Sequence, residues 1–491
     1  MVVAQQLNGE ATTHKENLMS KKLMSLKAAA LLASAALTMG VLGFISPAAA
    51  VVDCTKATTN TNECTVLTVN TFGDVIQPAL VADYRKLRPD IKLSIKKSDL
   101  DALNGTGLFT QCAAGGAGNP DIAAVEISYS GFWRAYPQCF FDLTKLKNTN
   151  NKSAADIKKD YLPWRWEHGV GYNDAVIGIP TDVGGLEVSY RWDLFKLAGL
   201  PYQRDAVSKE WSTWTKFIAF GKKYLAATKT AKFKAGLAAL AKTGTSTNKK
   251  FYASQKPIGF MDNIGTVYPA VMNQGTEKYY RNNGTDAGQL VYKTNKQVKL
   301  AFDTTVSASN AAIGTRIGQF SSDWNVGMSK GTFAVMLSPA WMMDYIKGQA
   351  PDTKGKWDIA DIPGGGGNQG GSQLSIPKGA KEPQEAWNFI SWYLAPAQQL
   401  KVFQTYGLFP STPSLYSNPE LIGFKDPFFN NAPVGKIYAD GVKKLKPIFE
   451  GKLQRCIDMA MGSAISLVAN GKEKNAKKAF DGGITAAGKC K

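Results

Sequence analysis

The chain has 491 residues, of which 44% are hydrophobic and 20% are charged, and its net charge is +19. This length favours two lobes over one domain, and the composition excludes a largely disordered protein. The charge raises nucleic acid or an anionic surface as a partner. Because the lysines are widely spread and no arginine-rich recognition helix is present, we expect a solvated basic surface and no nucleic-acid partner. An anionic small ligand stays open.

The N-terminal region has the pattern of an export signal. Lysines at positions 21–27 form a basic stretch, and the 18 residues Ala28–Ile45 are uncharged and mostly apolar. Small residues at Pro47–Ala50 then resemble a cleavage site. We therefore assign residues 1–50 to a leader and signal peptide and expect an exported protein. An uncleaved membrane anchor is the alternative, because about 18 helical residues just span a bilayer.

Six cysteines follow this segment, an even number that fits disulfide bonds in an oxidising compartment. We expect disulfides between sequence neighbours, although six cysteines allow many other pairings. The expected pairs are Cys54–Cys64, Cys112–Cys139 and Cys456–Cys490.

Two other uses of the cysteines are disfavoured. His168 is the only histidine after the signal peptide, so we expect no metal site. Asp53 stands immediately before Cys54, where a lipid-attachment signal needs a small residue. We therefore favour the periplasm of a Gram-negative cell over a lipid-anchored position at the cell surface.

Strands and helices alternate in the first part of the chain. Thr65–Phe72 has the pattern of a strand, an amphipathic helix follows, and Ile91–Ile95 alternates as a second strand. A third apolar strand covers Ile122–Ile127. This alternation predicts an α/β sheet with both faces covered. Ligands of such sheets bind beyond the carboxyl ends of the strands, here Phe72–Asp74 and Glu126–Tyr129.

A second unit begins after Ile177–Pro180. Glycines interrupt the chain before the strand Leu186–Tyr190, and an amphipathic helix with Trp214 and Tyr224 on its apolar face follows. The Lys/Ala/Thr-rich stretch Ala226–Lys256 has the pattern of a helix and an exposed loop. A strongly amphipathic helix at residues 386–394 is ended by a proline.

Motifs of common catalytic sites are missing. There is no GxSxG elbow, no P-loop and no GxGxxG fingerprint, and a Ser–His–Asp site would need His168 as its base. Gly364–Gly367 has no lysine of the phosphate-loop type, which favours a flexible connection. A carboxylate pair could serve a glycosidase, since sequence does not give the distance between two acids. We expect a binding protein with no enzymatic activity and no cofactor.

Two of the eleven tryptophans are distinguished by their surroundings. Trp341 follows Leu337–Ala340, where a predicted strand gives way to a helix, and Trp324 lies in the polar run Ser321–Asn325. An aromatic ring in such a place can cover the apolar face of a sugar, while carboxylates and amides bind its hydroxyls. We predict ligand contact for both tryptophans.

Six sequence blocks follow one another over about residues 65–412. They read TVNTFGDVIQPALVADYRKLRPDIKLSI, NPDIAAVEIS, GIPTDVGGLEVSYRWDLFKLAGLP, KEWSTWTKF, MSKGTFAVMLSPAW and GGSQLSIPKGAKEPQEAWNFISWYL. In these blocks the chain resembles the extracellular solute-binding proteins of carbohydrate-uptake ABC transporters, the group that includes maltose-binding protein. Each block alone is weak evidence for the resemblance, but the occurrence of all six blocks in the family's order makes the whole set specific for this family.

The resemblance implies an α/β fold of two lobes, the type II periplasmic binding protein fold, with crossing hinge strands between the lobes. By block position, residues 64–187 and 359–395 form the N-terminal lobe, and residues 188–358 and 396–491 form the C-terminal lobe. The ligand would bind in the cleft, and hinge closure would bury it. The strand Trp357–Ile362 is the expected hinge crossing.

The resemblance, the strand ends and the aromatic residues together predict the ligand contacts. The expected ligand-binding residues are Phe72, Asp74, Glu126, Ser128, Asp182, Trp324, Trp341, Gly371 and Ser372. Trp341 matches the family's stacking tryptophan, while Gly371 and Ser372 match its glycine-rich cleft loop. Each of the carboxylates has an alternative interpretation as a surface charge or a helix cap.

The implied function is that of the substrate-binding component of an ABC importer. A monomer would capture a sugar or oligosaccharide and deliver it to the transmembrane subunits of the permease. The basic charge keeps a second ligand class open on the same fold: an anionic or phosphorylated polyol, a polyamine, or a metal chelate, for which Tyr279-Tyr280 is a weak indication. A secreted glycosidase is the third alternative.

Overall fold

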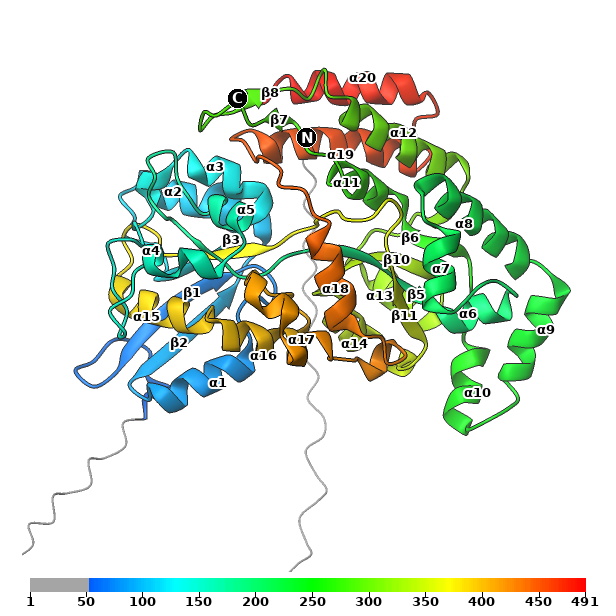
Figure 1. Ribbon diagram of the computed structural model, residues 1–491, viewed down its shortest axis with the longest axis horizontal. Helices are drawn as coiled ribbons and strands as arrows, with labels where there is room; N and C mark the ends of the chain where they lie inside the picture. The colour runs from blue at the N-terminus through cyan, green and yellow to red at the C-terminus, as the bar shows by residue number, and fades with distance from the viewer. Residues whose placement is uncertain (1–52) are drawn as a thin grey trace, which may run out of the picture. The chain divides into compact units, whose positions relative to one another are not determined.

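Two five-stranded sheets organise residues 53–491, which are the residues that the computed structural model describes (Figure 1). The leader, signal peptide and cleavage site expected within residues 1–50 lie outside the described residues. The architecture is mixed α/β, as expected from the alternation of strands and helices in the sequence. Between residues 53 and 491, no helix combines the length and the apolar character needed to cross a membrane.

The first sheet has the strand order β2-β1-β3-β12-β4. Its strands are β1 (Thr65–Thr71), β2 (Ile91–Lys97), β3 (Ile122–Glu126), β4 (Ile179–Pro180) and β12 (Ser372–Ser375). β1 pairs in parallel with β2 and β3, and β12 pairs antiparallel to β3 and β4. The three strands expected in the first part of the chain are therefore confirmed, and β12 joins them from far along the sequence.

Helices cover both faces of the first sheet. Along β3, Ile122 and Ala124 pack with one hydrophobic cluster, and Ala123 and Val125 pack with another. Figure 1 shows α1 (Pro78–Leu87) and α15 (Pro383–Tyr393) on one side of the sheet and α2 (Leu108–Ala113) and α3 (Ser130–Arg134) on the other. This burial on both faces explains why β3 is an uninterrupted apolar run.

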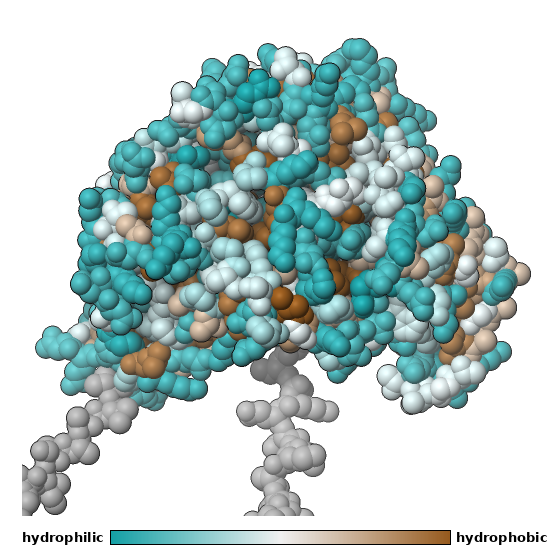
Figure 2. All heavy atoms as spheres, viewed as in Figure 1, coloured by the Kyte–Doolittle hydropathy of each residue, from teal (hydrophilic) through white to brown (hydrophobic). Residues whose placement is uncertain are grey.

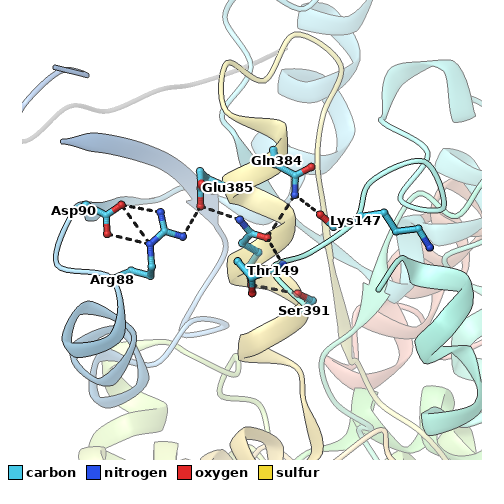
Figure 3. A network of polar contacts seen from close by, with 8 residues as sticks. Arg88, Asp90, Lys147, Thr149, Gln384, Glu385 and Ser391 are labelled. Atoms are coloured by element: carbon cyan, nitrogen blue, oxygen red, sulfur yellow. Dashed lines mark hydrogen bonds and ion pairs between the residues drawn. The ribbon is translucent and has the colours of Figure 1, made fainter. Parts of the chain in front are cut away.

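A polar network fixes α15 to its surroundings (Figure 3). Arg88 donates to Asp90 at 2.7 Å and to Glu385 at 2.9 Å. Asn388 on the same helix donates to the same Glu385 oxygen, Oε2, at 3.0 Å and accepts from the Thr149 backbone N–H at 3.1 Å. The network joins the turn before β2 to the helix that follows β12, and so connects segments about 300 residues apart in sequence.

The second sheet has the strand order β11-β5-β10-β6-β9. Its strands are β5 (Leu186–Arg191), β6 (Gly259–Asn263), β9 (Gly314–Thr315), β10 (Phe333–Pro339) and β11 (Trp357–Ala360). All six residues of β5 are buried. Side chains of β10 are divided between two clusters, with Ala334, Val335 and Leu337 in one and Phe333 and Met336 in the other. Both faces of this sheet are therefore covered as well.

The helices of the second half supply these two clusters. One cluster is built mainly by α6 (Trp192–Leu197), α8 (Trp214–Thr228), α11 (Val267–Met272), α12 (Lys296–Asn310), α19 (Gln454–Ala469) and α20 (Ala476–Ala487). The other is built mainly by α13 (Ser322–Lys330), α14 (Met342–Gln349), α16 (Pro396–Tyr406), α17 (Pro419–Ile422) and α18 (Val434–Lys443). The remaining elements are α4 (Ala154–Ile157), α5 (Pro163–Glu167), α7 (Arg204–Glu210), α9 (Ala231–Leu240), α10 (Ser246–Ala253), the pair β7 (Tyr280–Arg281) and β8 (Gln289–Leu290), and short 3-10 or π turns that include Ala102–Gly107 and Ile127–Tyr129.

The lysine-rich stretch Ala226–Lys256 forms two helices, α9 and α10, rather than a helix and a loop. Thr230 accepts a hydrogen bond from the Phe233 N–H, and Thr245 accepts one from the Asn248 N–H, so each threonine caps a helix. Few residues of these helices are buried, which explains why their periodicity is weak in the sequence. Figure 2 shows a mainly hydrophilic face of the protein, with hydrophobic residues in scattered small groups.

Three segments connect the two sheets and pair with one another. Residues 181–185 lie between β4 and β5, residues 361–371 lie between β11 and β12, and residues 407–412 follow α16. The Val183 N–H donates to Phe409 O at 2.9 Å, and the Gln369 N–H donates to Gly184 O at 2.7 Å. Because β11 pairs with β5 over its whole length, β11 belongs to the second sheet, and the chain crosses to the first sheet after it. The hinge crossing was expected within Trp357–Ile362.

Three disulfides join the pairs of neighbouring cysteines expected from the sequence, Cys54–Cys64, Cys112–Cys139 and Cys456–Cys490. The third bond connects the start of α19 to the residues after α20. The two helices also pack closely against each other, with Met461 and Ala464 of α19 beside Gly483 of α20. The disulfide therefore stabilises a helical hairpin at the C-terminal end of the chain.

Replacing Cys456 and Cys490 together by serine should lower the free energy of unfolding by about 2–4 kcal/mol, because the bond restricts the unfolded chain. Urea denaturation followed by circular dichroism measures the loss. The matched control replaces Cys54 and Cys64, which close a separation of 10 residues instead of 34 and should cost less. Equal stability of wild type and the first variant would contradict a stabilising role for this bond.

Candidate functional site

A cavity of about 1140 Å³ lies between the ends of the first sheet, the crossing segments and helices α11, α14 and α19. Its lining brings together residues from positions 72 to 470 of the chain. Eight of the nine expected ligand-binding residues line it: Phe72, Asp74, Glu126, Ser128, Asp182, Trp341, Gly371 and Ser372. The ninth, Trp324, lies elsewhere.

The carboxyl ends of β1 and β3 form one wall. Phe72 and Asp74 follow β1, and Asp74 is exposed and paired with Lys97. Glu126 ends β3 and accepts hydrogen bonds from the backbone N–H of Ser128, at 2.8 Å, and from its hydroxyl. Burial raises the pKa of the Glu126 carboxyl, and the bonds from Ser128 partly offset this rise. This wall therefore offers oxygen acceptors at the place that the topology of a parallel sheet predicts.

Asp182 connects the first crossing segment to β12. Its Oδ1 accepts from the Thr181 hydroxyl at 2.6 Å and from the Ser372 N–H at 2.9 Å. Arg165 donates to Ser372 O at 2.7 Å and to Asp182 O at 3.1 Å. All four residues are buried. Burial raises the pKa of Asp182, against the hydrogen bond from Thr181 and the charge of Arg165.

The glycine-rich segment before β12 approaches the opposite wall. Gly371 has a φ of +113°, and a Cβ there would lie 3.1 Å from both Arg165 Nη2 and Asp182 O, so the position requires glycine. A Cβ on Gly370 would lie 3.6 Å from Trp341 Nε1 and 4.0 Å from Glu126 Oε1. Trp341 Nε1 itself lies 3.5 Å from Gln369 O. Trp341 and the segment Gln369–Gly371 thus face one another.

Aromatic rings surround Trp341. Phe320 stacks on it with ring centroids 6.4 Å apart and an interplanar angle of 20°, and Tyr345 meets Phe320 edge-on at 5.4 Å. Phe320 is 52% exposed, and its backbone has a φ of +65°, an uncommon and strained value for a residue with a side chain. Phe320 was not predicted from the sequence, because its stacking on Trp341 depends on a backbone conformation that no sequence motif indicates.

Trp324, which was expected to contact ligand, is a core residue. Its ring is completely buried, and its Nε1 donates to Asp262 Oδ2 at 3.0 Å. Within α13 the buried residues are Trp324, Gly327 and Met328, which share one face of the helix, and its polar neighbours occupy the other face. Burial raises the pKa of Asp262 to about 6, despite the hydrogen bonds that its carboxylate accepts.

A buried charge cluster lines the cavity beside α19 and was not predicted. Lys278 Nζ lies 3.6 Å from Glu450 and 3.8 Å from Asp458. Burial raises the pKa of Glu450 to about 7, although Lys278 opposes this rise. Arg455 pairs with Asp101 of the first half at 2.6 Å. These residues are too far apart in sequence for spacing to connect them.

The hydroxyls of Tyr279 and Tyr280 both contact other groups of the protein. The Tyr279 hydroxyl lies 3.1 Å from that of Tyr268, and the Tyr280 hydroxyl accepts from the Leu453 N–H at 3.0 Å. Among the described residues, no group of three or more His, Cys, Asp or Glu side chains is arranged to hold a metal ion. The cavity combines aromatic surface with hydrogen-bond acceptors, an arrangement suited to reversible binding.

Comparisons with known proteins give one family. The model of the family described as "Bacterial extracellular solute-binding protein" matches residues 79–428. No protein with a curated description matches the chain. A solved structure of an extracellular solute-binding protein of family 1 is 29% identical, with a TM-score of 0.69, and the match covers 86% of this chain and 99% of that one.

Two further solved structures share the fold at lower identity. One is the galacto-N-biose/lacto-N-biose I-binding protein of a Bifidobacterium longum ABC transporter, with 18% identity, a TM-score of 0.64, and 88% and 98% of the two chains covered. The other is the sugar-binding protein MalE of Xanthomonas citri, with 18% identity, a TM-score of 0.61, and 86% and 97% covered. These likenesses establish a two-lobed, MalE-like fold.

Asp262→Asn should flatten the pH dependence of stability. Because the folded state raises the pKa of Asp262 from 3.8 to about 6, its contribution is present at low pH and is lost as pH rises from 4 to 6. When the pH rises from 4 to 6, the decrease in the free energy of unfolding should be smaller in the variant than in wild type, by up to about 3 kcal/mol. Urea denaturation at both pH values measures the difference.

The control for this experiment is Asp323→Asn, which alters an exposed carboxylate beside Trp324. It should reproduce the wild-type change in stability. Identical pH profiles for wild type and Asp262→Asn would contradict the raised pKa.

Proposed function

Since the chain belongs to the bacterial extracellular solute-binding proteins, we propose that it is the substrate-binding component of an ABC importer for a sugar or oligosaccharide. The observation that carries the proposal is the arrangement of Trp341 opposite Gln369–Gly371 in a cavity of about 1140 Å³. A ring on one wall and hydrogen-bonding groups on the other suit a flat, hydroxylated ligand. The protein would release its ligand to the transmembrane subunits of a permease.

The proposed ligand contacts follow the geometry of the cavity. Trp341 and Phe320 would cover the apolar face of a sugar ring, and Asp74, Glu126 and Ser128 would bind hydroxyls. Asp182, Gly371 and Ser372 would act mainly by holding the crossing segments in place, since their polar groups already bond to one another. Buried acceptors that lose a hydroxyl partner are costly, so such groups would set specificity.

The proposed lobes are centred on the two sheets. The sequence-based boundaries place residues 64–187 and 359–395 in one lobe and residues 188–358 and 396–491 in the other. The position of β11 supports moving the second boundary to the crossing segment 361–371. Rotation about the paired crossing segments would open and close the cavity, with ligand shifting the population towards the closed form.

The remaining proposals concern location and chemistry. Three disulfides support export to an oxidising compartment, and we propose the periplasm. We also propose a monomer that performs no catalysis. Names of structural relatives support the carbohydrate ligand: they include proteins in complex with beta-1,6-galactobiose and with lacto-N-biose.

Mass spectrometry of protein purified under non-denaturing conditions should detect a copurified sugar or oligosaccharide. After removal of that ligand by unfolding and refolding, at least one member of a broad panel of mono- and oligosaccharides should raise the melting temperature, because a ligand that binds only the folded state stabilises it. An unchanged melting temperature across the whole panel, with no sugar copurified, would contradict the carbohydrate assignment.

Trp341→Ala should weaken binding of that sugar at least about tenfold, which corresponds to about 1.4 kcal/mol, because the stacking surface is lost. Isothermal titration calorimetry measures the affinity. Trp192→Phe is the control, since Trp192 donates to Gly355 O outside the cavity and should leave the affinity unchanged. Retained affinity in Trp341→Ala would assign the stacking role to another residue.

A further inference from the structure

The cavity and the whole protein have opposite charge. The chain carries a net charge of +19, yet seven Asp and Glu side chains among the described residues line the cavity, against one lysine and one arginine. The basic surface therefore gives no guide to the ligand. Its lysines lie mainly outside the cavity, where water solvates them.

Both cations of the lining are already neutralised by protein carboxylates. Lys278 lies 3.6 Å from Glu450 and 3.8 Å from Asp458, and these acids raise its pKa although burial works against its charge. Arg455 pairs with both oxygens of Asp101, at 2.6 and 2.9 Å. Arg455 Nε has no partner among the described residues, so this guanidinium keeps one free N–H, but an anionic ligand would also meet several carboxylates.

Asp344 is a carboxylate without a protein partner. No hydrogen bond or ion pair within residues 53–491 involves its side chain, which lines the cavity and is partly buried. It lies three residues after Trp341 and one before Tyr345 in the first turns of α14, so all three share one face of the helix. A negative charge thus stands beside the aromatic rings that would stack on a sugar.

A second observation concerns unpaired acceptors deeper in the cavity. Glu450 is 5% exposed, and its Oε2 has no hydrogen-bond partner among the described residues. Asn368 Oδ1, also on the lining, is likewise without a partner in this part of the chain. Buried acceptors are normally satisfied, so we expect a donor from the ligand or from an ordered water at each of these oxygens.

We propose that the ligand is an amino sugar or an oligosaccharide with a protonated amine, whose ammonium group is bound by Asp344. This proposal rests on the carbohydrate-binding function proposed above and narrows its substrate class. The sugar ring would stack on Trp341, which places the ammonium near the Asp344 carboxylate. Glu450 Oε2 and Asn368 Oδ1 accept from ligand hydroxyl groups or a second amine.

The aromatic residues beside Asp344 favour the same class of ligand. An ammonium group over the face of a tryptophan or tyrosine is attracted by the ring, by about 0.5–2 kcal/mol depending on solvent exposure. An ammonium is also a donor of three hydrogen bonds and accepts none, which matches the two unpaired acceptor oxygens of the lining and leaves the unpaired Arg455 N–H to a ligand hydroxyl. A neutral sugar would leave the Asp344 charge partly desolvated, with only the attraction of Lys347 to compensate for it.

The test compares sugars that differ only in the group at carbon 2 of each ring. Glucosamine, galactosamine and the β-1,4 dimer of glucosamine are each paired with their hydroxyl and N-acetyl counterparts, and binding is measured by calorimetry at slightly acidic pH. At least one amine should bind at least about tenfold more tightly than both of its neutral counterparts. Equal or tighter binding of the neutral members of every set would overturn the proposal.

A variant of Asp344 then tests whether this residue binds the ammonium group. Asp344→Asn should weaken binding of the preferred amine at least about tenfold and leave the affinity for its neutral counterparts unchanged. Its melting temperature should be no lower than that of wild type, because the side chain makes no hydrogen bond within the described residues and burial raises its pKa. Asp286→Asn, on an exposed loop outside the cavity, is the matched control. An equal loss for amine and neutral sugars in Asp344→Asn would overturn the role of Asp344.

The outcomes separate the two proposals. If neutral sugars bind and amines do not, the carbohydrate-binding function stands and the amine inference fails. If no sugar of either kind binds, both fail.

Discussion

The hydrogen bonds around Ser372 hold the two cavity walls in their relative positions. Asp182 accepts from the Ser372 N–H, and Arg165 donates to Ser372 O and to Asp182 O. The first crossing segment is thereby joined to β12, and through the glycine-rich segment before β12 it is joined to the wall that carries Trp341. Because these groups are buried, loss of one partner would leave a charge without compensation, which typically costs several kcal/mol.

Buried charge recurs elsewhere in the molecule. Arg191 and Asp193 form a buried ion pair behind the second sheet, and Lys278, Glu450 and Asp458 form a cluster beside the cavity. In each case the pairing compensates for the desolvation of the charges. The same low-dielectric surroundings that stabilise these pairs make the unpaired oxygens of the cavity energetically significant.

The sequence predicts those parts of the fold that depend on local pattern. β1, β2 and β3 follow from apolar alternation bounded by turn residues, and Trp341 from its place after a strand. Phe320 and the charge cluster on α19 could not be found in this way, because a backbone dihedral and contacts across nearly 200 residues create them. Trp324 was wrongly assigned to the ligand, because its polar neighbours face solvent while the ring points inward.

The exposed apolar surface of Phe320 has a thermodynamic consequence for ligand binding. The chain has 47 glycines and uses many of them at positive φ, yet this position keeps a large ring with half of its surface exposed. A sugar face that covers Phe320 and Trp341 would release water from apolar area that folding left uncovered. Ligand capture should then carry a negative heat-capacity change, so that its enthalpy becomes more favourable as temperature rises.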